Sequence, residues 1–360
     1  MTRERVWVGS YTPDSEPAGI GAGIYQVWFD TGTGQLGSDG LAAATCGPSF
    51  LAAHPTGNHL YAVNEHTDGT VTAFAVQPQG ELTELSQVST GASVPCHLTV
   101  PPGARELVVS HYADGVVTVL PLTSDGCPAP PAAHLTHVGH GPIAERQQGP
   151  HAHCARLAPD GRHLLVADLG TDELRCYVPD PVTHRMQRTM PIPLPPGSGP
   201  RHLVSAANGQ VYVVGELDAT LHLLRWPTGG YDGHAGFDSQ HIVPEVTVSA
   251  VGDDQPVSYP AELALSRCGR RLYVANRGAD CVSTFAVDGP VPQHLADVST
   301  GGSWPRHFAL AGDLGEYLLV ANQFSHTLTV LWCDPDTGIP ADTGQRLEVP
   351  SPAMVLSHGR

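Results

Sequence analysis

The chain has 360 residues, of which 41% are hydrophobic and only 15% are charged, and its formal net charge at pH 7 is −17. This negative charge argues against a nucleic-acid partner, which would need a basic surface. The 40 glycines and 33 prolines favour many short strands separated by tight turns, because both residues interrupt regular elements.

One pattern returns six times along the chain: a Pro-led strand, a turn, an apolar strand, a polar break and an alternating strand. In chain order the apolar strands read LYAVNE (60–65), LVVSHY (107–112), LLVADL (164–169), VYVVGE (211–216), LYVANR (272–277) and LLVANQ (318–323). Their starts lie 46 to 61 residues apart. The alternating segments that follow, such as TVTAFAV and TLTVLWC, have the period of two that is typical of strands. We therefore expect repeated β-sheets and no amphipathic helix.

The two ends of the chain supply a seventh unit. VWVGSY (6–11) and GIYQVWF (23–29) match the second and third strands of the repeat, and SPAMVLS (351–357) matches its Pro-led first strand. Sharing one sheet between the termini hides the last edge of a ring of sheets. The sequence thus predicts an all-β fold: a seven-bladed β-propeller of four-stranded antiparallel blades, formed by residues 1–360 as a single domain. A pair of β-sandwiches is the alternative, but it leaves the matching half-repeats unexplained.

The eight cysteines form no CxxC pair, and several lie inside apolar strands, as buried free thiols do. The beginning of the chain, MTRERVWVGSYT, lacks the apolar stretch of a signal peptide, and no later segment is long enough to span a membrane. These features predict a reduced, cytoplasmic protein with no membrane partner. Both a monomer and a dimer are compatible with the sequence.

Polar residues recur where the apolar strands end and along the Pro-led strands. The first set includes Glu65, Asp168, Glu216 and Arg277, and the second includes His97, His151, His153, Arg201, His202, Glu262, Arg306 and His307. Equivalent positions of several blades converge at one mouth of a propeller, so we expect a ligand site there. Asp168 has a structural alternative, because Asp at a strand end often bonds turn backbone. Glu216 and Arg277 each follow a long apolar strand, where a charge needs a partner.

His151 and His153 are two residues apart, so a strand would point both side chains to the same face. A zinc site needs at least three protein ligands, and the segment HAHCAR does not complete an HxHxDH metal motif. We therefore expect no metal at this pair. The pair is better interpreted as acid–base or substrate-positioning groups.

The ordered set of motifs resembles the seven-bladed propeller lactonase family, which includes cycloisomerase-like 6-phosphogluconolactonases and carboxy-muconate lactonising enzymes. The resemblance runs from VWVGSYT to SPAMVL and is most specific in PHAHCARLAPDGRHLLVADLGTDELRCYV, GPRHL and VYVVGELDATL. It implies catalytic roles for His153, Arg201, Glu216 and Arg277. Candidate substrate-binding residues at the same mouth are His151, His202, Arg306, Asp168 and Glu65.

The resemblance implies a lactonase that needs no cofactor and acts on a small anionic lactone, first of all 6-phosphogluconolactone of the oxidative pentose phosphate route. Arg201 or Arg277 would stabilise the carbonyl oxygen, and His153 or Glu216 would act as the base for water. The sequence contains no GxSxG nucleophile elbow. A muconate-type cycloisomerase and a non-catalytic binding propeller are the alternatives, and the second predicts that Glu216 and Arg277 are dispensable.

Overall fold

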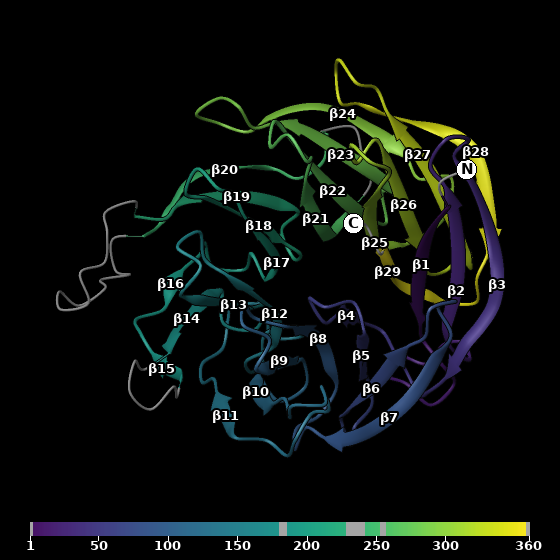
Figure 1. Ribbon diagram of the computed structural model, residues 1–360. Coiled ribbons are helices and arrows are strands. Elements are labelled where there is room, and N and C mark those ends of the chain that lie inside the picture. Colours follow the sequence, from purple (N-terminus) through teal and green to yellow (C-terminus); the bar gives the residue numbers. More distant parts are fainter. Residues whose placement is uncertain (1–2, 180–185, 228–241, 253–256, 358–360) are drawn as a thin grey trace.

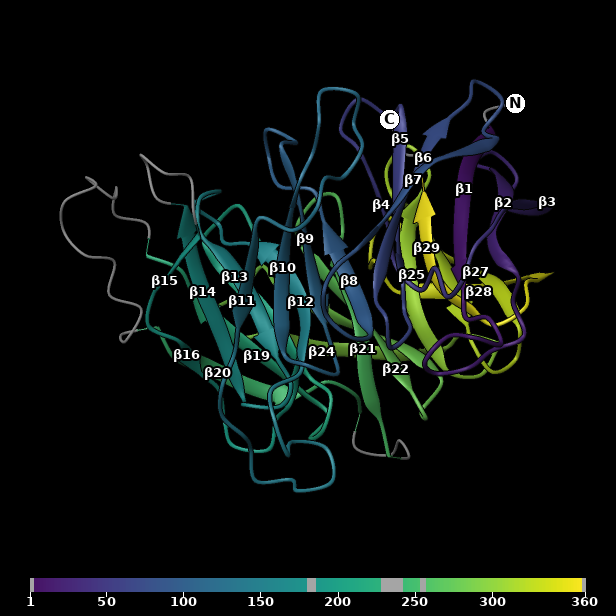
Figure 2. The same cartoon turned by 90° about the horizontal axis from the view of Figure 1, so that it is seen from below.

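The computed structural model describes residues 3–179, 186–227, 242–252 and 257–357. They form seven antiparallel sheets arranged as blades around a central axis (Figure 1), and these residues contain no helix. Figure 2 shows that the strands run between the two faces of the ring, on which the connecting loops lie. The predicted seven-bladed propeller is therefore confirmed.

Six blades follow one another along the chain, each numbered from its inner to its outer strand. They are β4 (Leu51–Ala53), β5 (His59–Asn64), β6 (Thr70–Val76) and β7 (Leu82–Ser89); β8 (Pro95–Thr99), β9 (Glu106–His111), β10 (Val116–Pro121) and β11 (Ala133–Thr136); β12 (Ala152–Leu157), β13 (Leu164–Asp168), β14 (Glu173–Pro179) and β15 (Met186–Arg188), with β16 (Ile192–Pro193) paired to β14; β17 (Pro200–Ser205), β18 (Gln210–Gly215), β19 (Thr220–Arg225) and β20 (Pro244–Ser249); β21 (Tyr259–Leu265), β22 (Arg271–Arg277), β23 (Cys281–Ala286) and β24 (Gln293–Ser299); and β25 (Pro305–Ala311), β26 (Tyr317–Asn322), β27 (Thr327–Cys333) and β28 (Pro340–Glu348).

The seventh blade is built from both ends of the chain, as the half-repeats predict. Its inner strand is β29 (Pro352–Ser357), followed outward by β1 (Arg3–Ser10), β2 (Gly23–Asp30) and β3 (Gln35–Ala44). The inner strand also joins its neighbours: Met354 packs in one interblade core with Leu51, and Val355 packs in the next. Pairing of β29 with β1 therefore closes the ring.

The second strand of each blade is buried on both faces, because neighbouring blades pack against it from either side. This explains its continuous run of Val, Leu and Ala. The six predicted apolar strands agree with the structure to within one residue at either end. Glu65 and Glu216 consequently lie immediately after β5 and β18, at the start of the connecting turns.

A β-bulge interrupts the inner strand of six blades. The residues left out of the ladder are Cys96, His153, Arg201 with His202, Ala261 with Glu262, Arg306 and Ala353. A bulge re-aims a side chain and ends regular pairing, and bulges are frequent beside active sites. Here they bring side chains from successive blades to the axis of the ring.

Truncation of the closing strand should weaken the whole ring. Met354 is 4% exposed and packs between two blades, so Met354→Ala removes buried apolar contacts and leaves a cavity. We expect a loss of about 2–5 kcal/mol in the free energy of unfolding, measured by urea denaturation. Leu314→Ala is the control, because Leu314 is 80% exposed. Equal unfolding midpoints for the two variants would contradict this role of β29.

Candidate active site

Glu216 is the centre of a buried charge cluster at the mouth of the channel. Its Oε1 accepts a hydrogen bond from Arg146 Nη2 at 2.6 Å, and its Oε2 accepts one from Arg277 Nη2 at 2.6 Å. Arg201 Nε lies 3.0 Å from the same Oε2. Burial alone would raise the pKa of Glu216, but the charges of Arg277, Arg201 and Arg146 outweigh it and hold this pKa well below the ordinary carboxyl value. Glu216 therefore stays ionised and orients three guanidinium groups.

Arg201 carries a charge that the protein compensates only in part. The residue is 2% exposed, and its Nη1 is buried and donates no hydrogen bond to any described residue. Burial and the nearby charges of Arg277 and Arg306 lower the pKa of Arg201 to about 9. A negatively charged or electron-rich group placed beside Arg201 would offset this penalty.

His153 lies in the bulge of β12 and is 5% exposed. Its ring forms no hydrogen bond within the described part of the chain, and Nδ1 is fully buried. Burial lowers the pKa of His153 well below the ordinary value, and the charge of Arg201 lowers it further. The imidazole is therefore neutral at neutral pH and keeps a lone pair.

His151 precedes β12 and is held differently from His153. Its ring stacks on Tyr112 with the centroids 4.5 Å apart, and its Nδ1 donates to the Tyr112 carbonyl oxygen at 2.6 Å. Asp168 Oδ1 accepts the backbone N–H of His151 at 2.8 Å, while its Oδ2 lies 2.6 Å from His137 Nδ1. Asp168 is thus fully buried behind His151 and does not line the channel cavity.

Glu65 and Arg306 come from two further blades, Glu65 directly after β5 and Arg306 from β25. Glu65 accepts hydrogen bonds from the Ser49 hydroxyl and, at 3.1 Å, from the Tyr11 hydroxyl. The Arg306 guanidinium carbon lies 5.0 Å from the centroid of the Tyr11 ring. No described residue accepts a hydrogen bond from Arg306, so its guanidinium is available to a ligand. These residues line a small cavity together with Arg201 and His202, whereas His153, Glu216 and Arg277 lie outside its lining.

Sequence reasoning missed Arg146, which completes the cluster around Glu216. Arg146 lies in the long loop between β11 and β12, its side chain is 38% exposed, and its Nη2 also lies 3.3 Å from the Tyr112 hydroxyl. Arg146 lies outside the strands that repeat along the chain, so the repeat could not locate it. Among the described residues, no group of three or more His, Cys, Asp or Glu side chains is arranged to hold a metal ion.

Comparison with known proteins agrees with this architecture. Residues 5–357 match the family described as lactonase, 7-bladed β-propeller. The chain belongs to this family. It is 31% identical over 364 residues to the 6-phosphogluconolactonase of Bacillus subtilis, covering 99% of this chain and 98% of that protein. Its structure is similar to that of the periplasmic gluconolactonase of Pseudomonas aeruginosa, with a TM-score of 0.87, 31% identity and 99% coverage of both chains.

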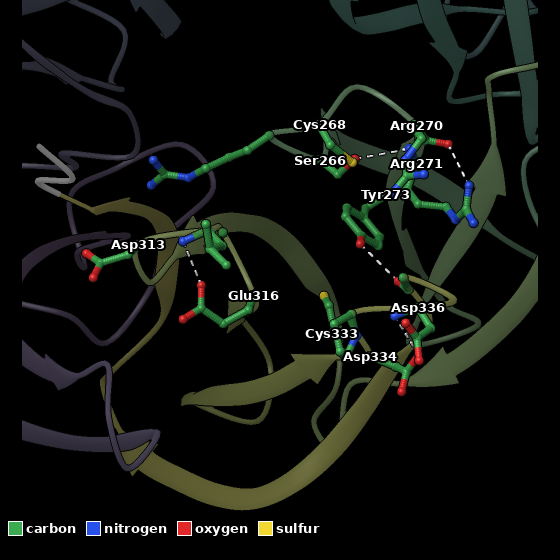
Figure 3. Close-up of a pocket in the computed structure, with 15 residues that line it drawn as sticks. Ser266, Cys268, Arg270, Arg271, Tyr273, Asp313, Glu316, Cys333, Asp334 and Asp336 are labelled. Carbon is green, nitrogen blue, oxygen red and sulfur yellow. Dashed lines mark hydrogen bonds between the residues drawn. The ribbon is translucent and has the colours of Figure 1, made fainter.

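This member of the lactonase family has a larger cavity of about 450 Å³ away from the channel site. Figure 3 shows Ser266, Cys268, Arg270 and Tyr273 on one side of it, with Glu316 on another. Cys268 is exposed, and a hydrogen bond with Ser266 together with the neighbouring Arg270 lowers the pKa of its thiol to about 7. All eight cysteines are free, and no described helix is long and apolar enough to cross a membrane.

Cys268 should be the first thiol to react with a limiting amount of iodoacetamide at neutral pH. Its thiolate is populated and accessible, whereas burial raises the pKa of Cys154 to about 11 and that of Cys176 to about 12. Mass spectrometry of peptides would locate the adduct. Cys268→Ser should remove the fast phase and Cys127→Ser should retain it. Fast labelling that persists in Cys268→Ser would refute this assignment.

Proposed function

We propose that this chain is a cytoplasmic, single-domain enzyme that hydrolyses 6-phospho-D-glucono-1,5-lactone to 6-phosphogluconate. The observation that carries the proposal is the placement of a neutral, buried His153 beside arginines that Glu216 orients at one mouth of the channel. Relatives named 6-phosphogluconolactonase, from Bacillus subtilis and, at 27% identity, from Formosa agariphila, support the substrate. The free cysteines support a reducing compartment, although one structural neighbour is periplasmic.

His153 is the better candidate for the base that activates water. Both oxygens of Glu216 are engaged by guanidinium groups, and its lowered pKa makes it a poor proton acceptor. The ring of His153 has no partner among the described residues. In this mechanism a water oxygen bonds to the lactone carbonyl carbon while His153 takes the water proton. General-base help of this kind contributes about 10²–10⁴ in rate.

The arginines stabilise the negative charge that develops on the carbonyl oxygen. Arg201 has an unsatisfied Nη1, and Arg277 is fixed by Glu216 and by a 3.1 Å hydrogen bond from its Nε to the Tyr259 carbonyl oxygen. The tetrahedral intermediate then collapses with cleavage of the bond between the carbonyl carbon and the ring oxygen. The protonated His153 returns its proton to that oxygen, which gives the hydroxy acid.

The remaining residues of the mouth bind the substrate. Arg306 forms no hydrogen bond with a described residue and is placed to hold the anionic phosphate. His151 is fixed by Tyr112 and presents the edge of its ring, and Asp168 contributes through the backbone of His151. Glu65 keeps Tyr11 and Ser49 in place beside Arg306.

Lactone hydrolysis tests the assignment directly. With freshly generated 6-phosphogluconolactone and coupled oxidation of 6-phosphogluconate, Arg201→Ala should lower kcat about 10²–10³-fold, because one donor to the oxyanion is lost. Glu216→Ala should also lower kcat, because three arginines lose their common anchor. Arg105→Ala, on an exposed turn, is the matched control. Turnover should survive a chelator. Wild-type rates in both active-site variants would exclude this site or this substrate.

The pH dependence of kcat/KM reports the state of His153. Because its pKa lies well below the ordinary imidazole value of about 6.5, the free enzyme keeps the base unprotonated through that pH. The rate should therefore be flat across neutral pH and decline only when the pH falls below this lowered pKa. A buffered pH series, corrected for spontaneous hydrolysis, measures the acid limb. An acid limb centred at or above the ordinary imidazole pKa would contradict a buried neutral base.

A further inference from the structure

Glu262 lies beside two histidines from the two neighbouring blades, His202 of β17 and His307 of β25. It lies in the bulge of β21 and is 6% exposed. Its Oε2 lies 2.7 Å from His202 Nδ1 and 3.3 Å from His307 Nε2. No arginine forms an ion pair with Glu262 among the described residues. The His202 imidazole therefore donates a hydrogen bond to this buried carboxylate, and the His307 ring lies beside it.

The bonding pattern fixes the tautomer of each histidine. His307 Nδ1 accepts the backbone N–H of Val355 at 3.4 Å, so its proton is on Nε2, which lies 3.3 Å from Glu262 Oε2. Burial and the charge of Arg156 lower the pKa of His307 to about 4, although Glu262 raises it. His202 donates from Nδ1, and burial and the charge of Arg201 lower its pKa well below the ordinary value. A neutral His202 therefore carries its lone pair on Nε2.

His202 Nε2 is a buried acceptor without a partner. The residue is 3% exposed, and Nε2 accepts no hydrogen bond from any described residue. His202 lines the channel cavity together with Arg201, whose Nη1 is a buried donor that is also unsatisfied. A buried polar atom left unsatisfied carries a desolvation penalty, so a ligand in this cavity gains by donating to His202 Nε2 and by accepting from Arg201 Nη1.

We propose that Glu262 is a positioning residue that fixes His202 as a hydrogen-bond acceptor for a hydroxyl group of the substrate. The channel floor thereby selects polyhydroxylated lactones over lactones without ring hydroxyls. The inference rests on the proposed function for the reaction and adds a specificity determinant to it. A hydroxyl group can donate to His202 Nε2, and hydroxyl oxygens can also accept from Arg201 Nη1, so a polyhydroxylated ligand suits both unsatisfied atoms.

A carboxylate or phosphate oxygen does not meet the same requirement. It has no proton to donate to His202 Nε2, and the charge of Glu262 stands directly behind the ring. Protonation of His202 would remove the mismatch, but burial and the positive charges of Arg201, Arg156 and Arg306 oppose it. The floor therefore disfavours a dicarboxylate such as a muconate, while the arginines nearer the mouth still accept an anion.

The test compares ligands with and without hydroxyl groups. Kinetics would use D-glucono-1,5-lactone and δ-valerolactone, and calorimetry would use their products, gluconate and 5-hydroxypentanoate. In His202→Phe, kcat/KM for gluconolactone and affinity for gluconate should fall about 10- to 100-fold. The kcat/KM for δ-valerolactone and the affinity for 5-hydroxypentanoate should change less than about 2-fold. His202→Gln can still donate to Glu262 and accept from a hydroxyl, so it should retain much of the preference. His54→Phe, in a turn outside the channel, is the matched control.

Variants of Glu262 test its role in positioning. Glu262→Gln keeps an oxygen that accepts from His202, whereas Glu262→Met does not. Long-range ¹H–¹⁵N spectra should show the Nδ1–H tautomer of His202 in wild type and Glu262→Gln, and a mixture of tautomers in Glu262→Met. Selectivity for gluconolactone should fall in parallel with this mixing. An unchanged tautomer with unchanged selectivity in Glu262→Met would overturn the proposal.

The outcomes separate this inference from the proposed reaction. If wild type turns over neither lactone but prefers gluconate, and His202→Phe loses that preference, the reaction is wrong and the hydroxyl subsite stands. If lactones are hydrolysed but His202→Phe affects both substrates equally, the subsite is wrong and the reaction stands. If wild type binds both acids equally, the subsite is overturned whatever the turnover.

Discussion

Closure of the ring by pairing of β29 with β1 is the constraint on which the rest of the structure depends. Without this pair the seventh sheet would lack its inner strand, and the ring would keep an additional exposed edge at β1. Once the ring is closed, a bulge near the start of an inner strand turns a side chain toward that axis. His153, Arg201 and Arg306 come from three different blades and reach the same channel mouth for this reason.

The channel mouth gathers positive charge, although the chain as a whole is negative. The protein carries a formal charge of −17, yet Arg146, Arg201 and Arg277 surround a single carboxylate at the site. One negative charge cannot balance three positive ones. Burial, together with the uncompensated charges of Arg277 and Arg306, lowers the pKa of Arg201. The imbalance is a local preference for an anion, set within an acidic surface that favours solubility. This local preference agrees with the anionic lactone that we propose as the substrate, even though the whole chain is negative.

The sequence predicted those features that follow from periodicity and strand ends. The repeat located the second strand of six blades, and the polar residue that ends such a strand identified Glu216 and Arg277. The bulges were not predicted. The Pro-led strands are short, so one extra residue is enough to hide the alternation of inward and outward side chains. Arg146 was out of reach because its loop belongs to no repeat. The bond between Glu262 and His202 joins residues 60 positions apart on neighbouring blades, and its geometry depends on both bulges.

The arginines and the histidines of the channel act on one another. Arg201 lowers the pKa of both His153 and His202, so the positive cluster that attracts an anion also keeps its neighbouring imidazoles neutral. A neutral imidazole can accept a proton or a hydrogen bond, whereas a protonated one can do neither. Glu262 binds Nδ1 of His202, so Nε2 is the nitrogen that remains able to accept. In the proposed mechanism, attraction of an anion, retention of a base and recognition of a hydroxyl thus depend on the same buried charges.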